Sequence, residues 1–370
     1  MQFFIDVLVA GLMAYLSFTN FLAVGIATIT GQELPGPSTE TIETPAATET
    51  QPEETTSLLT PLQSAFARIP DILLQSAEYQ QATVITSTKP EPTPVDPLDA
   101  VVNIYCTFTS DRYIRTTTGT GFLVSEDGII LTNAHVAQFL LLAETEVLGD
   151  SQCTVRTGSP AAPRYKAELL YIPPAWIAEH ASLIDAKSPS GTGERDYALL
   201  HITESVDDDP LPERFPALRI LTTPLTPRAI AGDITAAGYP AGTVTGDTAT
   251  NLLARRATTT ISELFTFGTS TVDVLALRGS RIGEQGASGG PIVNTDGYVI
   301  GMIATRGNDE KDGTGSLRAI SIDHINRTIT EETGASIGAH LSGDIKARAA
   351  IFASTMTPFL SELLTLEIEN

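Results

Sequence analysis

Short apolar runs separated by turn residues fill the chain from about residue 100 onward, and this pattern limits the fold more than any other feature. The runs have the length of strands and are rich in β-branched residues. Examples are "VVNIYCTFT" (101–109), "GTGFLVS" (119–125), "YALLHI" (197–202) and "GYVIGMIA" (297–304). Such runs predict an antiparallel all-β sandwich or barrel and not a sheet built from βαβ units.

An acidic, proline-containing segment, "ESVDDDPLPERFP" (204–216), lies near the middle of this β-rich region. Its composition is typical of a connection between two halves. A run with helical spacing follows the last expected strand, and the final residues are too few for another standard domain. We therefore expect one domain over 98–335, with two strand-rich halves (98–205 and 217–320) and a closing helix (320–332), followed by a helical C-terminal tail (336–370).

Residues 7–29 form an apolar run of 23 residues that contains no charged side chain. This length is sufficient to cross a membrane as a helix, and no clear small-x-small cleavage site follows it. A buried core helix is the alternative interpretation. Because the first basic residue is Arg68, almost no positive charge lies near this run, and the positive-inside rule gives little information on its orientation. We expect residues 1–30 to be a single-pass transmembrane signal anchor in the cell membrane, with the bulk of the chain outside the cytoplasm.

The segment after this run has the composition of a linker. Residues 31–56 contain almost only threonine, glutamate, proline, alanine and small polar residues, which cannot bury enough apolar area to offset the entropy of ordering. Apolar residues at helical spacing then mark a short amphipathic segment, broken by Pro70: Leu62, Phe66, Ile69 and Leu73. A second proline-rich hinge covers 89–97. Residues 31–97 are therefore expected to be a disordered linker with one short amphipathic segment.

The charge and the cysteine count exclude several classes of function. The chain has 44 acidic and 22 basic residues, a formal net charge of −22, which repels phosphate backbones, so no nucleic-acid partner is expected. The two cysteines, Cys106 and Cys153, are too few for a disulfide-dense scaffold or a cysteine-rich metal site. Composition alone is compatible with one bridge or with two buried thiols. No spacing of histidine and carboxylate residues indicates a metal, and no cofactor is expected.

The stretch "GEQGASGGPIVN" (283–294) places one serine, Ser288, among glycines directly before a strand-like run. It is either a plain surface turn or a nucleophile whose backbone must approach a substrate closely. Of five histidines, His135 is the best candidate for a base, because two strands joined by an Asp-Gly turn lead directly into it. A structural histidine is the alternative. Asp196 opens an apolar run, so its carboxylate lies at a strand entrance and is a candidate to orient the histidine.

Three blocks, "GTGFLVSEDGIILTNAHV", "DYALL" and "GASGGPIVN", occur in this order. They resemble the His, Asp and Ser blocks of the trypsin/chymotrypsin-like serine peptidases, most closely the bacterial HtrA-type branch, which "GYPAG" also suits. The resemblance covers about residues 98–335. It implies two six-stranded antiparallel Greek-key barrels with the active site between them. His135 and Asp196 would come from the first barrel and Ser288 from the second.

The resemblance also implies roles for residues around the nucleophile. The backbone N–H groups of Gly286 and Ser288 would form the oxyanion hole. Ile282 would lie near the floor of the pocket for the residue before the scissile bond, and Ala304 and Thr305 on its walls. These uncharged side chains predict a preference for a small-to-medium apolar residue at that position.

Ala287 departs from the family pattern, in which aspartate or asparagine is usual. Digestive members of the family use that aspartate to bind the N-terminal amine freed by propeptide cleavage. An alanine cannot form this ion pair, so activation by propeptide cleavage is not expected, and other contacts must hold the oxyanion segment. The chain also lacks room for the PDZ module that often follows HtrA-type domains.

The resemblance places Cys106 and Cys153 on the first and fourth strands of the first barrel. These strands are neighbours when such a barrel closes, so a disulfide between the two cysteines is predicted. A disulfide agrees with a domain outside the cytoplasm.

These features lead to the expectation of a membrane-anchored serine endopeptidase that cleaves unfolded or flexible protein or peptide segments by a His-Asp-Ser triad and an acyl-enzyme. The alternative is a protease-fold module that has lost turnover and binds peptides or envelope proteins. A third hypothesis makes the anchor and stalk the functional parts and the barrels a spacer.

Overall fold

The structure is a computed structural model that describes residues 74, 76–84, 91–109, 114–143, 150–185, 193–241, 251–268, 270–278, 282, 286–306 and 317–369. The predicted membrane span at 7–29, the stalk at 31–56 and the apolar residues at 62–73 lie outside these residues. Within the described ranges, no single helix is long and apolar enough to cross a membrane, although one pair of consecutive helices bent by 45° meets that criterion jointly.

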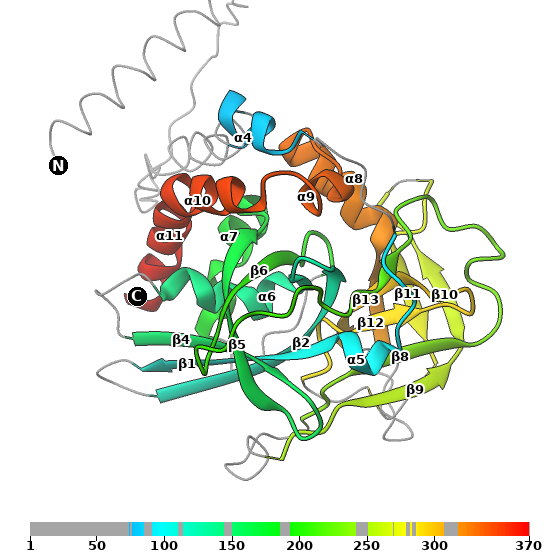
Figure 1. The fold of residues 1–370 in the computed structure, drawn as a ribbon. Coiled ribbons are helices and arrows are strands. Elements are labelled where there is room, and N and C mark those ends of the chain that lie inside the picture. The colour runs from blue at the N-terminus through cyan, green and yellow to red at the C-terminus, as the bar shows by residue number, and fades with distance from the viewer. Residues whose placement is uncertain are drawn as a thin grey trace, which may run out of the picture. The chain divides into compact units, whose positions relative to one another are not determined.

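The first half of the domain is a closed six-stranded antiparallel barrel (Figure 1). Its strands are paired in the order β1-β2-β3-β6-β5-β4: β1 (Val101–Thr109), β2 (Ile114–Ser125), β3 (Ile129–Thr132), β4 (Asp150–Thr157), β5 (Ala162–Tyr171) and β6 (Ala198–Ser205). The tight turn between β2 and β3 needs Gly128, whose φ of +85° lies in the left-handed region. This barrel confirms the all-β prediction for the first half of the domain.

The second half is an eight-stranded sheet in which one strand, β7, pairs in parallel with β13. The other strands follow the order β10-β11-β14-β13-β12-β8-β9. Their bounds are β7 (Arg219–Ile220), β8 (Ile234–Gly238), β9 (Arg255–Thr259), β10 (Ile261–Phe265), β11 (Val274–Leu277), β12 (Pro291–Val293), β13 (Tyr298–Arg306) and β14 (Leu317–Ser321).

The expected second closed barrel is therefore corrected to a half-barrel. Its two edge strands, β9 and β10, are consecutive in the chain, with only Thr260 between them. They do not pair with each other in the sheet, so the barrel is not closed by hydrogen bonds. The segment pairs with β8 before Thr260 and with β11 after it, and the register with β11 shifts between Ile261 and Glu263. A strand that changes partner and register in this way cannot form one continuous ladder.

The predicted disulfide is confirmed. Cys106 on β1 lies directly opposite Cys153 on β4 in the antiparallel register, and the two sulfurs are bonded. The bridge links residues 47 positions apart, a separation for which the chain-entropy model gives a stabilisation of about 4 kcal/mol.

Helices at the C-terminal end cover the first barrel. The expected closing helix is α8 (Ile322–Thr333), which Ser321 caps at its start and Gly334 ends with a φ of 74°. The helices that follow are α9 (Ile337–His340), α10 (Ile345–Thr355) and α11 (Thr357–Glu369). Helix α10 packs on β5, and α11 packs on α7 (Pro174–His180) and on the short helices η1 (Gln138–Leu142) and η2 (Ala181–Asp185). Figure 1 shows both helices against the first barrel.

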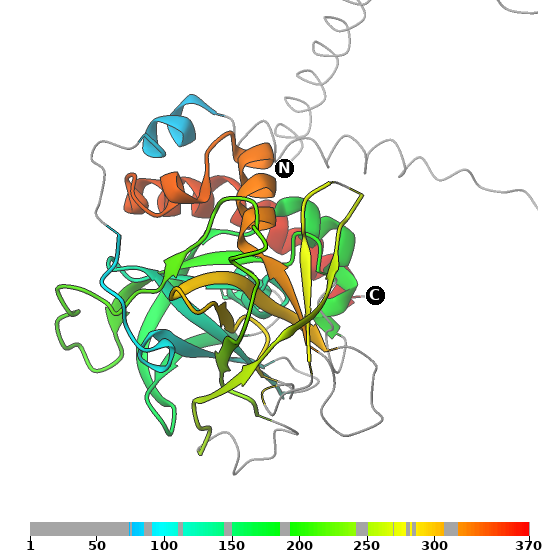
Figure 2. The same cartoon turned by 90° about the vertical axis from the view of Figure 1, so that its right-hand side faces the viewer.

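A short N-terminal helix, α4 (Ala77–Ala82), packs on these C-terminal helices (Figure 2). Tyr79 is fully buried there, and its hydroxyl donates to Nε2 of His340 at 3.2 Å. The guanidinium of Arg348, also fully buried, donates to the carbonyl oxygen of Ala82 at 3.0 Å and to that of His340. Residues expected to belong to the linker are thus part of the packed core.

Residues 91–100 then connect α4 to the first barrel across the second half of the domain. The hydroxyl of Tyr298, at the start of β13, donates to a carboxylate oxygen of Glu91 at 3.0 Å. Asp96 forms an ion pair with Arg256 on β9 and caps the short helix α5 (Pro97–Ala100), which leads into β1. We call residues 74–84 and 91–100 together the N-terminal strap.

Candidate active site

His135 and Asp196 are brought together by two paired strands. His135 lies in the short helix α6 (Ala134–Ala137) that begins directly after β3, and Asp196 comes just before β6, the partner of β3. Nδ1 of His135 donates to Oδ2 of Asp196 at 2.8 Å, and the backbone N–H of His135 donates to Oδ1 at 3.0 Å. Both side chains are buried. Both carboxylate oxygens are therefore bound to one residue, which fixes the ring and leaves Nε2 as its acceptor nitrogen.

Helix α8 holds the residues on either side of Asp196. The hydroxyl of Thr328 donates to that of Tyr197 at 2.9 Å, and Arg195 forms an ion pair with Glu332 at 2.7 Å. Arg195 has a φ of 55°, an uncommon conformation for a residue with a side chain, which surrounding contacts must maintain. Burial raises the pKa of Tyr197 well above its usual value, so its hydroxyl stays protonated. Sequence patterns gave no indication of these supports.

Ser288 lies in a turn just before β12 and is half-buried. Its carbonyl oxygen accepts the backbone N–H of Thr120, on β2, at 2.8 Å. The next residue, Gly289, has a φ of +88°, and a Cβ there would lie 1.9 Å from the carbonyl oxygen of Thr120 and 2.7 Å from the hydroxyl of Thr132. Only glycine allows this approach. The serine turn thereby packs against the middle of β2 and against Thr132, the last residue of β3, which precedes His135 by three residues.

Gly286 is also held in a conformation that favours glycine. Its φ is +95°, and a Cβ would lie 2.6 Å from the carbonyl oxygen of Tyr239. Its own carbonyl oxygen accepts the hydroxyl of Thr120 at 2.7 Å. Ala287 is buried in the apolar core of the second half, together with Ile292. Neutral hydrogen bonds and apolar packing thus hold the segment 286–288, for which the sequence predicted contacts other than an ion pair.

The three residues predicted to line the substrate pocket lie near this segment in the fold. Ile282 is buried and belongs to the same apolar core as Ala287. Ala304 is buried on β13, and Thr305 is paired with Arg318 of β14. Their role in substrate binding stays a prediction. In the ranges that the structure describes, no group of three or more His, Cys, Asp or Glu side chains is placed to hold a metal ion.

Comparison with protein families decides the class of the domain. The family model of the trypsin-like peptidase domain matches residues 119–302, a range that includes His135, Asp196 and Ser288. These residues form a trypsin-like peptidase domain. The predicted resemblance to the trypsin/chymotrypsin-like serine peptidases is thereby confirmed.

No curated protein matches the chain. Among solved structures, the domain is similar to the active form of the Rv3671c protease from M. tuberculosis, with 22% identity, a TM-score of 0.38, and coverage of 68% of this chain and 93% of that one. An inactive form of Rv3671c with a serine-to-alanine substitution gives 21% identity, a TM-score of 0.36, and coverage of 68% and 98%.

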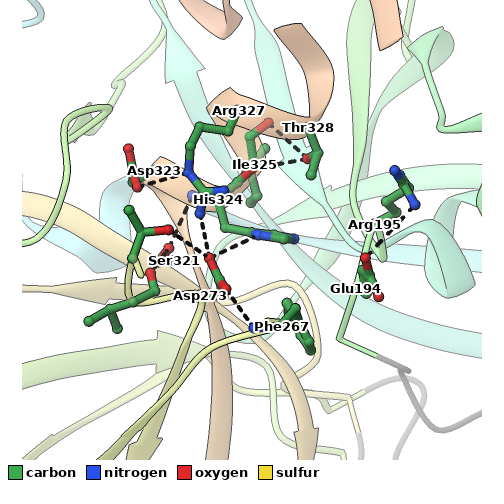
Figure 3. A network of polar contacts seen from close by, with 12 residues as sticks. Glu194, Arg195, Phe267, Asp273, Ser321, Asp323, His324, Ile325, Arg327 and Thr328 are labelled. Atoms are coloured by element: carbon green, nitrogen blue, oxygen red, sulfur yellow. Dashed lines mark hydrogen bonds and ion pairs between the residues drawn. The ribbon is translucent and has the colours of Figure 1, made fainter. Parts of the chain in front are cut away.

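The peptidase domain contains a second histidine–aspartate pair that the sequence analysis did not anticipate (Figure 3). Asp273 precedes β11 and His324 lies in the first turn of α8, and Nδ1 of His324 donates to Oδ1 of Asp273 at 3.2 Å. The same carboxylate is bound by Arg327 and accepts the backbone N–H of Phe267 at 2.6 Å. Burial lowers the pKa of His324, and the charge of Asp273 opposes this shift.

Proposed function

We propose that the chain is a membrane-anchored serine endopeptidase that hydrolyses peptide bonds in unfolded or flexible protein segments. The observation that carries this proposal is the binding of both carboxylate oxygens of Asp196 by His135. Such a carboxylate holds the imidazole in one tautomer and stabilises the imidazolium that forms when the ring accepts a proton. The family match supports the class of reaction.

In the proposed reaction, Oγ of Ser288 forms a bond to the scissile carbonyl carbon while its proton passes to Nε2 of His135. The carbonyl oxygen becomes an oxyanion, which the backbone N–H groups of Gly286 and Ser288 bind. The tetrahedral intermediate collapses, the C–N bond breaks, and His135 gives its proton to the leaving amine. Water then attacks the acyl-enzyme by the same route, which releases the acid and restores Ser288.

The remaining parts of the proposal concern substrate and location. Ile282, Ala304 and Thr305 carry no charge, which supports a small-to-medium apolar residue before the scissile bond. The apolar run at 7–29 is long enough to anchor the chain in a membrane. The disulfide between Cys106 and Cys153 favours an oxidising compartment, which supports a peptidase domain outside the cytoplasm.

A fluorophosphonate probe tests the proposal on the full chain. We expect the wild-type chain to be labelled, the Ser288→Ala variant to be unlabelled, and His135→Ala to react far more slowly. Ser262→Ala is the matched control, because this serine lies on β10 and donates its hydroxyl to the carbonyl oxygen of Ala276. A folded wild-type chain that neither reacts with the probe nor degrades casein would instead support the binding module.

A further inference from the structure

Thr120 connects the two halves of the peptidase domain at the nucleophile turn. It lies on β2 of the first barrel and is fully buried. Its backbone N–H donates to the carbonyl oxygen of Ser288 at 2.8 Å, and its hydroxyl donates to that of Gly286 at 2.7 Å. The hydroxyl also accepts the backbone N–H of Tyr239 at 2.9 Å. The carbonyl oxygen of Thr120 accepts the hydroxyl of Thr132 at 2.7 Å.

The direction of these bonds leaves the Thr120 hydroxyl no alternative. A hydroxyl has one proton to donate, and the N–H of Tyr239 can only donate to it. The proton of the hydroxyl must therefore point to the carbonyl oxygen of Gly286. The side chain of Thr120, which the residue after β8 holds in place, thus binds this carbonyl oxygen in one direction.

The same contacts set the orientation of the peptide groups around the nucleophile. Thr120 binds the carbonyl oxygens of Gly286 and Ser288, and the N–H of Gly290 binds that of Ala287 at 2.9 Å. Because a peptide group is planar and trans, fixing the carbonyl oxygen of Ala287 also fixes the direction of the N–H of Ser288. Every carbonyl oxygen from Gly286 to Ser288 is therefore bound. The two bonds from Thr120 fix the peptide groups on either side of the one that carries the Ser288 N–H, so Thr120 acts on that N–H through its neighbours.

Ala287 makes this arrangement necessary. Its side chain has no charge to pair with an amine and is buried among apolar side chains. The shape of the turn must then come from the backbone and from neighbours that bind it. Of the hydrogen bonds that hold these three carbonyl oxygens, the one from the Thr120 hydroxyl is the only side-chain bond that a substitution can remove without altering the backbone.

We propose that Thr120 is a positioning residue for the oxyanion hole, and that its hydroxyl holds Gly286–Ser288 in the shape that an ion pair of an aspartate gives in related peptidases. The inference rests on the proposed serine peptidase function. It deepens that function by assigning a first-barrel residue to the preparation of a second-barrel site. Since Thr132, the last residue of β3, also binds Thr120, the strand that leads to His135 and the oxyanion segment share one anchor.

The test compares Thr120→Val, which loses the hydroxyl at nearly constant volume, with Thr120→Ser, which keeps it. We expect Thr120→Val to lower kcat by up to about 10²-fold, the cost of losing an oxyanion donor, with little change in KM, because the donors remain but are no longer held in place. A peptidyl trifluoromethyl ketone, whose hemiketal adduct places an oxyanion in the hole, should lose affinity by the same factor. Thr120→Ser should stay close to the wild type in both measurements.

Thr333→Val is the matched control. Thr333 is a fully buried threonine in α8 whose hydroxyl donates to the carbonyl oxygen of Ile329 at 2.6 Å, away from the turn. It should lose thermal stability without a change in kcat. If Thr120→Val behaves like this control, Thr120 has only a structural role and the inference is wrong. If Thr120→Val does not fold, Thr120→Ser decides: a folded serine variant with the large kcat loss overturns the inference, and one with wild-type kcat supports it.

The outcome for the wild-type chain separates this inference from the function on which it rests. Turnover that depends on Ser288 supports the peptidase whatever the Thr120 variants do. A folded wild-type chain without Ser288-dependent turnover overturns the peptidase, and the role of Thr120 in oxyanion binding falls with it.

Discussion

Two histidine–aspartate pairs lie buried in the described part of the chain, and their surroundings differ. Asp196 gives both carboxylate oxygens to the ring and backbone of His135. Asp273 divides its oxygens among His324, Arg327 and the backbone N–H of Phe267 (Figure 3). The first pair is a dedicated unit of two residues, whereas the second is part of a wider ionic network at the start of α8.

The difference shows what makes such a pair suitable for proton transfer. A carboxylate that already balances an arginine contributes less to stabilising a positive charge on its histidine. In addition, Nε2 of His324 is buried and has no hydrogen-bond partner among the described residues. His135 differs in its position. It follows Thr132 by three residues, and the serine turn packs against Thr132. Proximity of histidine and aspartate therefore does not define a catalytic site by itself.

The largest expected effect comes from Asp196→Asn. The amide group favours the wrong tautomer of His135 and cannot stabilise the imidazolium, so kcat should fall by about 10⁴-fold, as for the equivalent change in a well-studied member of this family. Turnover of a peptide substrate and the rate of fluorophosphonate labelling measure this loss. A variant that keeps its turnover close to wild type would remove the distinction between the two pairs.

Asp273→Asn should have a smaller effect, on stability and not on catalysis. The substitution removes one of the two buried carboxylates that pair with Arg327 and leaves only Asp323, and we expect the free energy of unfolding to fall by about 2 kcal/mol. Urea unfolding measures this change, and kcat per folded molecule should equal that of the wild type. A loss of kcat comparable to that of Asp196→Asn would show that the second pair takes part in the reaction.

The smallest expected effect is a dependence of stability on pH that His324 causes. Burial lowers the pKa of His324 from its ordinary value of 6.5, so the unfolded chain binds more protons than the folded chain as the pH falls through that value. Its contribution to the free energy of unfolding is therefore complete above pH 6.5 and is lost on acidification. His324→Asn keeps a donor for Asp273 but does not titrate, so its stability should fall less between about pH 8 and about pH 5.5.

The wild type is the reference for this measurement because other groups titrate as well. Burial lowers the pKa of His340 to about 4, so His340 also destabilises the fold as the pH falls, in both proteins alike. Only the difference between the two stability curves belongs to His324. Identical curves would contradict the assignment.

The sequence predicted those parts of the molecule that local patterns encode. Strand-length runs and the Asp-Gly turn at Gly128 predicted an antiparallel all-β fold, and the glycines around Ser288 indicated either a turn or a close approach of the backbone to a substrate. In the structure Gly128, Gly286 and Gly289 all have positive φ, a conformation that glycine adopts readily. Such features depend on a few consecutive residues, so they can be recognised before the fold is known.

Features that depend on distant partners could not be predicted in this way. The open edge of the second half results from a change of partner at Thr260, which no local pattern indicates. Asp273 and His324 are 51 residues apart, and nothing in the sequence around either of them suggests the other. The roles of Thr120 and Glu332 likewise arise only when the serine turn and α8 pack on the first barrel.

The N-terminal strap has a mechanical consequence for the peptidase domain. The buried guanidinium of Arg348 and the hydroxyl of Tyr79 join α4 to the C-terminal helices. A force applied to the chain before residue 74 would therefore act first on the contacts between α4 and the C-terminal helices, and not directly on β1. Strand β1, which carries Cys106 of the disulfide, lies beyond this contact along the chain.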